Sequence, residues 1–139
     1  MRQILLIFSF VLIGCHNNDE PSLKQLRKPS LSEDLTGSQL YIKHCAICHQ
    51  KDAKGIIGVF PPIKDSDYFL EDPKRAIHNI LFGQSETIVV NGETYKTMMP
   101  PVKISDKEVV NVVNYLLNEV NQVDYKINIE DVESVRQHQ

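Results

Sequence analysis

A pentad of residues, Cys45-Ala46-Ile47-Cys48-His49, carries the strongest structural signal in the chain. The spacing Cys-x-x-Cys-His is typical of covalent haem c attachment. On a helix, positions i, i+3 and i+4 share one face, so both thiols and the imidazole face the same side. The two thiols can then add to the two haem vinyl groups while the imidazole reaches the iron. The pentad predicts one haem c, attached through Cys45 and Cys48 and ligated by His49.

Two other interpretations of the pentad are weaker. A thioredoxin-like dithiol needs a βαβ context, which the sequence does not show, and has no use for His49. A zinc site needs two further ligands at suitable spacing. No cysteine follows Cys48, and His78 and His138 stand isolated. A haem-free thiol oxidoreductase remains a minor alternative hypothesis.

The composition describes an ordinary globular protein. The chain has 139 residues, which is room for one domain. It contains 42% hydrophobic and 24% charged residues and carries a net charge of −3. A protein that coats nucleic acid would need a basic face, so we expect no nucleic-acid partner. Three cysteines are too few for a disulfide-stapled scaffold.

The N-terminal residues have the pattern of an export signal. Arg2 is followed by an apolar stretch from Ile4 to Ile13, which is too short to span a membrane. The stretch ends in Gly14-Cys15 and resembles the lipobox of bacterial lipoproteins, in which the cysteine is lipidated and becomes the N-terminus. An ordinary secretory signal with a chance cysteine is the alternative. We therefore expect a signal peptide at 1–14, lipidation of Cys15 and a membrane-anchored protein that faces the periplasm.

The domain boundaries follow from this pattern. Residues 17–32 are polar and interrupted by Pro21 and Pro29, so 15–34 are expected to form a lipidated, flexible tether. One cysteine takes lipid and two take haem, which accounts for all three. A domain is expected over 35–122. The pattern weakens after Val123, so 123–139 are assigned to an extension whose packing is left open.

Helix signals surround the pentad. Thr36 or Ser38 can cap a helix that leads into it. Asp72 and Pro73 are expected to be the N-cap and first residue of a second helix, which ends at Gly83. A third helix begins with the capping box Ser105-Asp106-Lys107-Glu108. Its apolar face is formed by Val109, Val112, Val113, Leu116, Leu117 and Val120.

A hairpin is expected before the only methionines downstream of the pentad. Asn91-Gly92 separates the runs 88–90 and 93–95, and Asn-Gly between two such runs is a strong signal for a two-residue turn. Met98 and Met99 follow in a proline-rich stretch. A thioether ligand raises the reduction potential of a haem and closes the iron to substrates.

The order of these motifs resembles the class I c-type cytochromes. The resemblance spans 35–122 and rests on Gly37-x-x-Leu40-Tyr41, the pentad, a loop from Gly55 to Gly58, Pro61-Pro62-Ile63, Met99-Pro100 and Tyr115. It implies a mostly α cytochrome c fold, with about four helices around one covalently bound haem and a short β-hairpin before the axial methionine loop. Longer runs resemble the small cytochrome domains found with copper nitrite reductases and quinoprotein dehydrogenases.

The resemblance also assigns residues around the iron. The methionine that directly precedes proline is the family's sixth ligand, which implies Met99, with Met98 as the alternative. A proline carbonyl accepts a hydrogen bond from the ligating histidine, which implies Pro61, although Pro62 lies close. An aromatic residue on the last helix packs across a glycine of the first, which implies Tyr115 and Gly37.

The function expected from these assignments is one-electron transfer without catalysis. With both axial positions filled, the iron has no vacant site for a substrate. The expected partner is a periplasmic reductase, a dehydrogenase or a terminal oxidase, and the protein is expected to be monomeric. The alternative is a haem enzyme or sensor that binds peroxide or NO at a labile sixth position.

Overall fold

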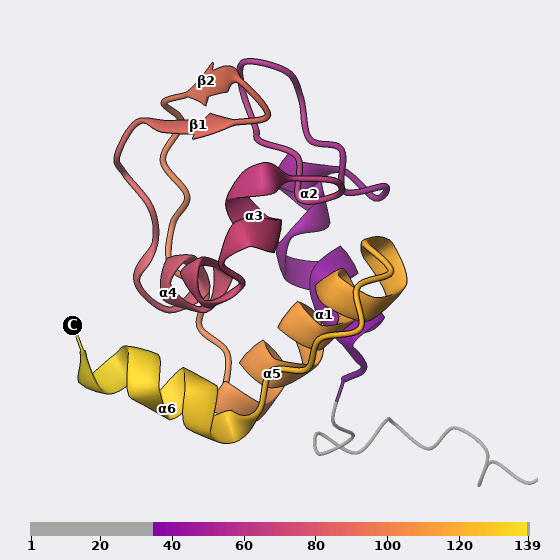
Figure 1. The fold of residues 1–139 in the computed structure, drawn as a ribbon, viewed down its shortest axis with the longest axis vertical. Helices are drawn as coiled ribbons and strands as arrows, with labels where there is room; N and C mark the ends of the chain where they lie inside the picture. Colours follow the sequence, from indigo (N-terminus) through magenta and orange to yellow (C-terminus); the bar gives the residue numbers. More distant parts are fainter. Residues whose placement is uncertain (1–34, 139) are drawn as a thin grey trace, which may run out of the picture. The chain divides into compact units, whose positions relative to one another are not determined.

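Residues 35–138 fold into a small helical domain with one hairpin (Figure 1). The computed structural model describes residues 35–138, so the predicted signal peptide, Cys15 and tether lie outside it. The helices are α1 (Gly37–His44), α2 (Ala46–His49), α3 (Asp67–Glu71), α4 (Lys74–Phe82), α5 (Asp106–Tyr115) and α6 (Ile129–Gln137). A π-helical segment, η2 (Leu116–Val120), continues α5, and β1 (Ile88–Val90) pairs with β2 (Glu93–Tyr95). The predicted mostly helical cytochrome c fold with a hairpin is confirmed, although residues 35–138 contain six α-helices where about four were expected.

Two helices distant in the sequence, α1 and α5, pack directly against each other. Thr36 caps α1 in a capping box with Gln39. A Cβ atom at Gly37 would lie 2.3 Å from the carbonyl oxygen of Asn111 and 2.5 Å from the Cβ of Tyr115. Only glycine allows this approach. The predicted contact of Tyr115 with Gly37 is therefore present.

The core lies along one face of α5. Ser105 caps this helix in the predicted capping box with Glu108. Apolar residues at helical spacing then point inward, and Val109, Val112, Val113, Leu116 and Leu117 are all buried. Within residues 35–138, no helix combines the length and apolar character that crossing a membrane requires.

The hairpin forms as predicted, and its turn is fastened to the start of α3. Ile88 pairs with Tyr95 and Val90 with Glu93. Asn91 and Gly92 both have positive φ, at 52° and 80°, as a tight hairpin turn requires. The Asn91 backbone N–H donates to the Asp67 carboxylate (2.8 Å), and the Asp67 backbone N–H donates to the Asn91 side-chain oxygen (2.9 Å).

The start of α4 differs from the prediction by one residue. The helix begins at Lys74 with Pro73 at the N-cap, whereas the sequence placed Asp72 there. Asp72 is extended, and its carboxylate accepts a hydrogen bond from the Lys74 backbone N–H at 3.1 Å. Asp72 therefore still satisfies a free N–H of the first turn, from one position further out.

The C-terminal residues join the core. The sequence left open whether 123–139 pack on the domain. In the structure, α6 packs against α4 and α5, and the side chains of Ile127 and Val132 are fully buried. Two hydrogen bonds connect the Asn114 side chain of α5 to the backbone of Ile127, at 2.8 and 2.9 Å.

Candidate haem centre

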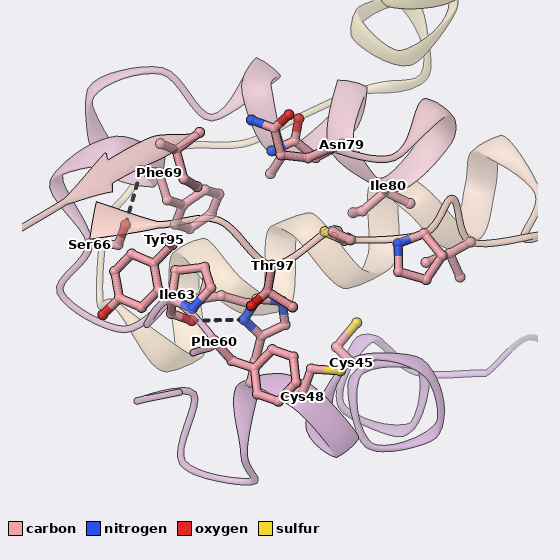
Figure 2. A pocket seen from close by; sticks show the side chains of 18 of the residues that line it. Cys45, Cys48, Phe60, Ile63, Ser66, Phe69, Asn79, Ile80, Tyr95 and Thr97 are labelled. Atoms are coloured by element: carbon pink, nitrogen blue, oxygen red, sulfur yellow. Dashed lines mark hydrogen bonds between the residues drawn. The ribbon is translucent and has the colours of Figure 1, made fainter. Parts of the chain in front are cut away.

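The predicted site residues line one cavity of about 450 Å³ (Figure 2). This volume lies within the range of roughly 300–1,000 Å³ that is usual for cofactor sites. The cavity is bounded by α2, the loop after it, α4, the hairpin and the segment from 97 to 103. The lining includes Cys45, Cys48, His49, Pro61, Pro62, Met98 and Met99, together with apolar side chains such as Phe60, Ile63, Phe69 and Ile80.

The two cysteines enter the cavity from the junction of α1 and α2. Cys45 ends α1 and precedes α2, so Cys48 follows three residues later on the same helical turn. No disulfide joins them, and their sulfur atoms point into the cavity (Figure 2). Burial, with a smaller contribution from Cys48, raises the pKa of the Cys45 thiol to about 11. Burial therefore disfavours the thiolate form that a redox dithiol uses as its nucleophile.

His49 is held in one tautomer by the loop that follows it. Its Nδ1–H donates to the carbonyl oxygen of Pro61 at 2.9 Å, which leaves Nε2 as the ring nitrogen available to a metal. Burial lowers the pKa of His49, and the hydrogen bond to Pro61 opposes this shift. The imidazole is therefore favoured in the neutral form, which is the form that binds metals.

Gly55 allows the Pro61 carbonyl to reach His49. Gly55 has a φ of +63°, and a Cβ atom there would lie 2.2 Å from the carbonyl oxygen of Phe60 and 2.6 Å from that of Pro61. Its backbone N–H donates to the carbonyl oxygen of His49 at 3.0 Å. A side chain at this position would push the loop away. The sequence marked a glycine-containing loop here, but did not reveal this role.

The methionine segment is fastened to the end of α4. The backbone N–H of Gln84 donates to the Met99 carbonyl oxygen (2.9 Å), and the Met99 N–H donates to the Gln84 carbonyl oxygen (2.7 Å). A Cβ atom at Gly83 would lie 2.8 Å from the Met99 carbonyl oxygen. Gly83 and Gln84 thus set the path of Met99. Sequence analysis predicted Gly83 only as the end of a helix.

The two methionines differ in burial. Met99 is partly buried and packs against the hydrophobic core. Met98 lines the rim of the cavity, but its side chain is 67% exposed. Only Met99 is therefore held by the core beside the cavity.

These residues fit haem c. The donor set is a neutral imidazole with a free Nε2, a thioether and two thiols spaced for the two vinyl groups, around a mostly apolar cavity. Cys45 and Cys48 would hold the macrocycle, and His49 with Met99 would hold the iron. The zinc interpretation finds no such support, because no three His, Cys, Asp or Glu side chains within residues 35–138 cluster as metal ligands would.

Comparison with known proteins finds relatives that are cytochromes or cytochrome subunits. The chain is 29% identical over 82 residues to the cytochrome c subunit of a quinone alcohol dehydrogenase from Gluconobacter oxydans, covering 58% of this chain and 17% of that subunit. A second such subunit, from Gluconacetobacter polyoxogenes, is 23% identical over 99 residues, covering 70% of this chain and 21% of the subunit. Cytochrome c-552 of Thermus thermophilus is 31% identical over 85 residues, covering 58% of this chain and 64% of the relative.

The chain thus spans about a fifth of the length of the two alcohol dehydrogenase subunits. A comparison with protein families matches residues 35–119 to the family described as cytochrome c. That match includes the pentad, the Pro61 loop and Met99, and it extends over more than half of the 139 residues. The chain belongs to the cytochrome c family.

Proposed function

We propose that the protein is a one-electron carrier in which His49 and Met99 are the axial ligands of one covalently attached haem c. The observation that carries this proposal is that a single cavity is lined by Cys45, Cys48, His49 and Met99. His49 already has its tautomer fixed, and Met99 is already fastened to Gln84. Both ligands would therefore need little rearrangement when electrons move.

The bound haem would supply an iron that alternates between the ferrous and ferric states. The role of this chain's residues is to keep the iron's surroundings constant in both states. Pro61 prevents rotation of the His49 ring by accepting from Nδ1–H. Apolar side chains such as Phe69 and Ile80 line the cavity and exclude water. Met99 would supply the second protein ligand to the iron and so leave no coordination site for a substrate.

We assign the sixth ligand to Met99 rather than Met98 on burial and backbone anchoring. Met99 packs against the core, and its backbone N–H and carbonyl oxygen both form hydrogen bonds with the backbone of Gln84. The side chain of Met98 is mostly exposed at the rim. The side chains of adjacent residues point in different directions. If one methionine faces the iron, the other therefore faces solvent.

The partner is proposed to be a dehydrogenase. Two relatives are cytochrome c subunits of quinone alcohol dehydrogenases, which supports a partner of this class over a reductase or a terminal oxidase. Ile47 and Met98 line the cavity and have exposed fractions of 85% and 67%. We place the electron-exchange contact at this apolar rim, because an edge of the cofactor would be nearest to a partner there.

The location is proposed from the N-terminal sequence alone. Lipidation of Cys15 would anchor the protein to a membrane, and the tether at 15–34 would let the cytochrome domain face the periplasm. Labelling of cells with a radioactive fatty acid tests the anchor. The label should appear on the wild-type protein and be absent from a Cys15→Ala variant.

The visible absorption spectrum tests the proposed function. We expect sharp low-spin haem c bands, a weak near-red band from methionine sulfur on ferric iron, and no change when CO is added to the reduced protein. A high-spin spectrum that shifts with CO would instead indicate an open iron, as in a haem enzyme or sensor. A protein without haem absorbance, made in cells that mature c-type cytochromes, would overturn both interpretations.

A further inference from the structure

The C-terminal segment, residues 123–138, covers α4 and α5 at the end of the domain away from the hairpin (Figure 1). Of the helices and strands that contact α4, α6 makes the most extensive contact with it. Ile127 and Val132 are fully buried in the same core cluster as Ile77 and Ile80 of α4. The C-terminal segment is thus part of the support on which α4 rests.

Polar contacts fix this segment to both helices. The Lys74 ammonium of α4 lies 2.9 Å from the Asp131 carboxylate of α6. The Arg136 guanidinium of α6 donates twice to the Asp106 carboxylate of α5, at 2.9 and 2.6 Å. With the Asn114 bonds to Ile127, these contacts hold α4 and α5 together through a third element.

The other end of α4 carries the methionine segment. The Val102 backbone N–H donates to the carbonyl oxygen of Ile80 at 2.8 Å, and Gln84 exchanges two backbone hydrogen bonds with Met99. Gly83 lies against Met99 and Pro101 with no room for a side chain. A displacement of α4 would therefore move the backbone of Met99.

We propose that the C-terminal segment is a clamp that positions Met99, by holding α4 against α5 and so fixing the helix end to which the methionine segment is bonded. The proposal rests on the proposed function, in which Met99 ligates the iron. Val132, Asp131 and Lys74 act as positioning residues, since none of them lines the cavity. Each contact of the clamp joins a residue beyond the predicted 35–122 boundary, such as Asp131 or Arg136, to α4 or α5 inside it.

The clamp makes a prediction about exogenous ligands. Imidazole binds ferric iron only in molecules whose Met99 has left the sixth position. Its apparent affinity is therefore proportional to the fraction of such molecules, in the way any ligand of a minor state behaves. Loosening α6 should raise this fraction while His49 and both thioether bonds remain in place.

The test compares Val132→Ala with Val112→Ala in the full haem-loaded protein. Both valines are buried, and Val112 lies on α5 next to the Gly37 contact with α1 rather than on α6. We expect Val132→Ala to raise the apparent imidazole affinity at least about fivefold over Val112→Ala, which corresponds to about 1 kcal/mol. Hydrogen exchange at the Met99 amide should accelerate in the same variant. Equal effects of the two substitutions would overturn the clamp.

The surface ion pair of Lys74 with Asp131 provides a second test that does not change the packing of the core. Lys74→Gln should weaken the near-red band and raise imidazole affinity, whereas Lys74→Arg should restore both because it retains the ion pair with Asp131. If Lys74→Gln matches the wild type, the ion pair has no positioning role. If the wild-type protein lacks the near-red band, ligation by Met99 is itself refuted. If the wild type has the band and the variants behave like it, only the clamp is refuted.

Discussion

The two sides of the cavity are constructed differently. On the histidine side, Cys45, Cys48 and His49 lie within five consecutive residues, and the partner of His49, Pro61, follows 12 residues later. On the methionine side, Met99 lies outside any helix and is bonded to Gln84, at the end of α4. The histidine side is therefore organised by neighbours in sequence, and the methionine side by contacts between distant elements. Disturbances of packing should reach Met99 before they reach His49.

The largest expected effect comes from a methyl group on the histidine side. Gly55→Ala would place a Cβ atom 2.6 Å from the Pro61 carbonyl oxygen that holds His49. We expect this variant to lose about 2–4 kcal/mol of unfolding free energy, since the chain must shift against backbone atoms. Denaturant titration of the haem-loaded protein measures the loss.

Gly92→Ala is the matched control for Gly55→Ala. Gly92 also has a positive φ, at 80°, but no atom lies within 4 Å of a Cβ placed there. Its cost should be limited to the left-handed backbone, about 1–2 kcal/mol. If both substitutions cost the same, the Gly55 contact with Pro61 contributes nothing, and the histidine side is less tightly organised than described.

A smaller effect is expected from the equivalent change on the methionine side. Gly83→Ala would place a Cβ atom 2.8 Å from the Met99 carbonyl oxygen, at a φ of +83°. We expect a loss of about 1–3 kcal/mol of stability, because the methionine segment can move away. The near-red band should weaken while the covalent haem is retained. Retention of the full band would show that Met99 does not depend on the end of α4.

Most of the histidine side could be predicted from the sequence because its geometry is local. The pentad sets both thiols and the imidazole on one helical turn, and the family pattern pointed to the Pro61 carbonyl, which accepts from His49 at 2.9 Å. The hairpin and the capping box of α5 followed from residues adjacent in the chain. What the sequence did not reveal is that Gly55 makes room for Pro61, since that contact depends on how the loop closes.

The methionine side was predictable only in part. A methionine before proline indicated Met99, but nothing in the sequence indicated its bonds to Gln84. The sequence left open whether Val132 packs on the domain and gave no sign that Ile127 is buried, because the apolar pattern after Val123 is short and interrupted. Long-range packing of this kind has no local signature in the sequence.

The smallest expected effect is a pH dependence at α6. The Asn128 backbone N–H, and then Lys74, lower the pKa of Asp131 below its ordinary value. Asp131 should therefore stabilise the fold fully above its unfolded-state pKa of about 3.9, and lose this contribution as pH falls through its lower folded-state pKa. Urea unfolding from pH 7 to pH 3 should show the wild-type advantage over Asp131→Asn shrinking only below about pH 4. A constant difference would contradict the assignment.

The central claim is that Met99 closes the iron opposite His49, and the near-red absorption band of the ferric protein tests it most directly. We would compare Met99→Ala and Met98→Ala side by side in the haem-loaded protein. We expect Met99→Ala to abolish the band and to allow imidazole to bind readily, while Met98→Ala keeps the wild-type spectrum. Loss of the band in Met98→Ala with its retention in Met99→Ala would contradict the account.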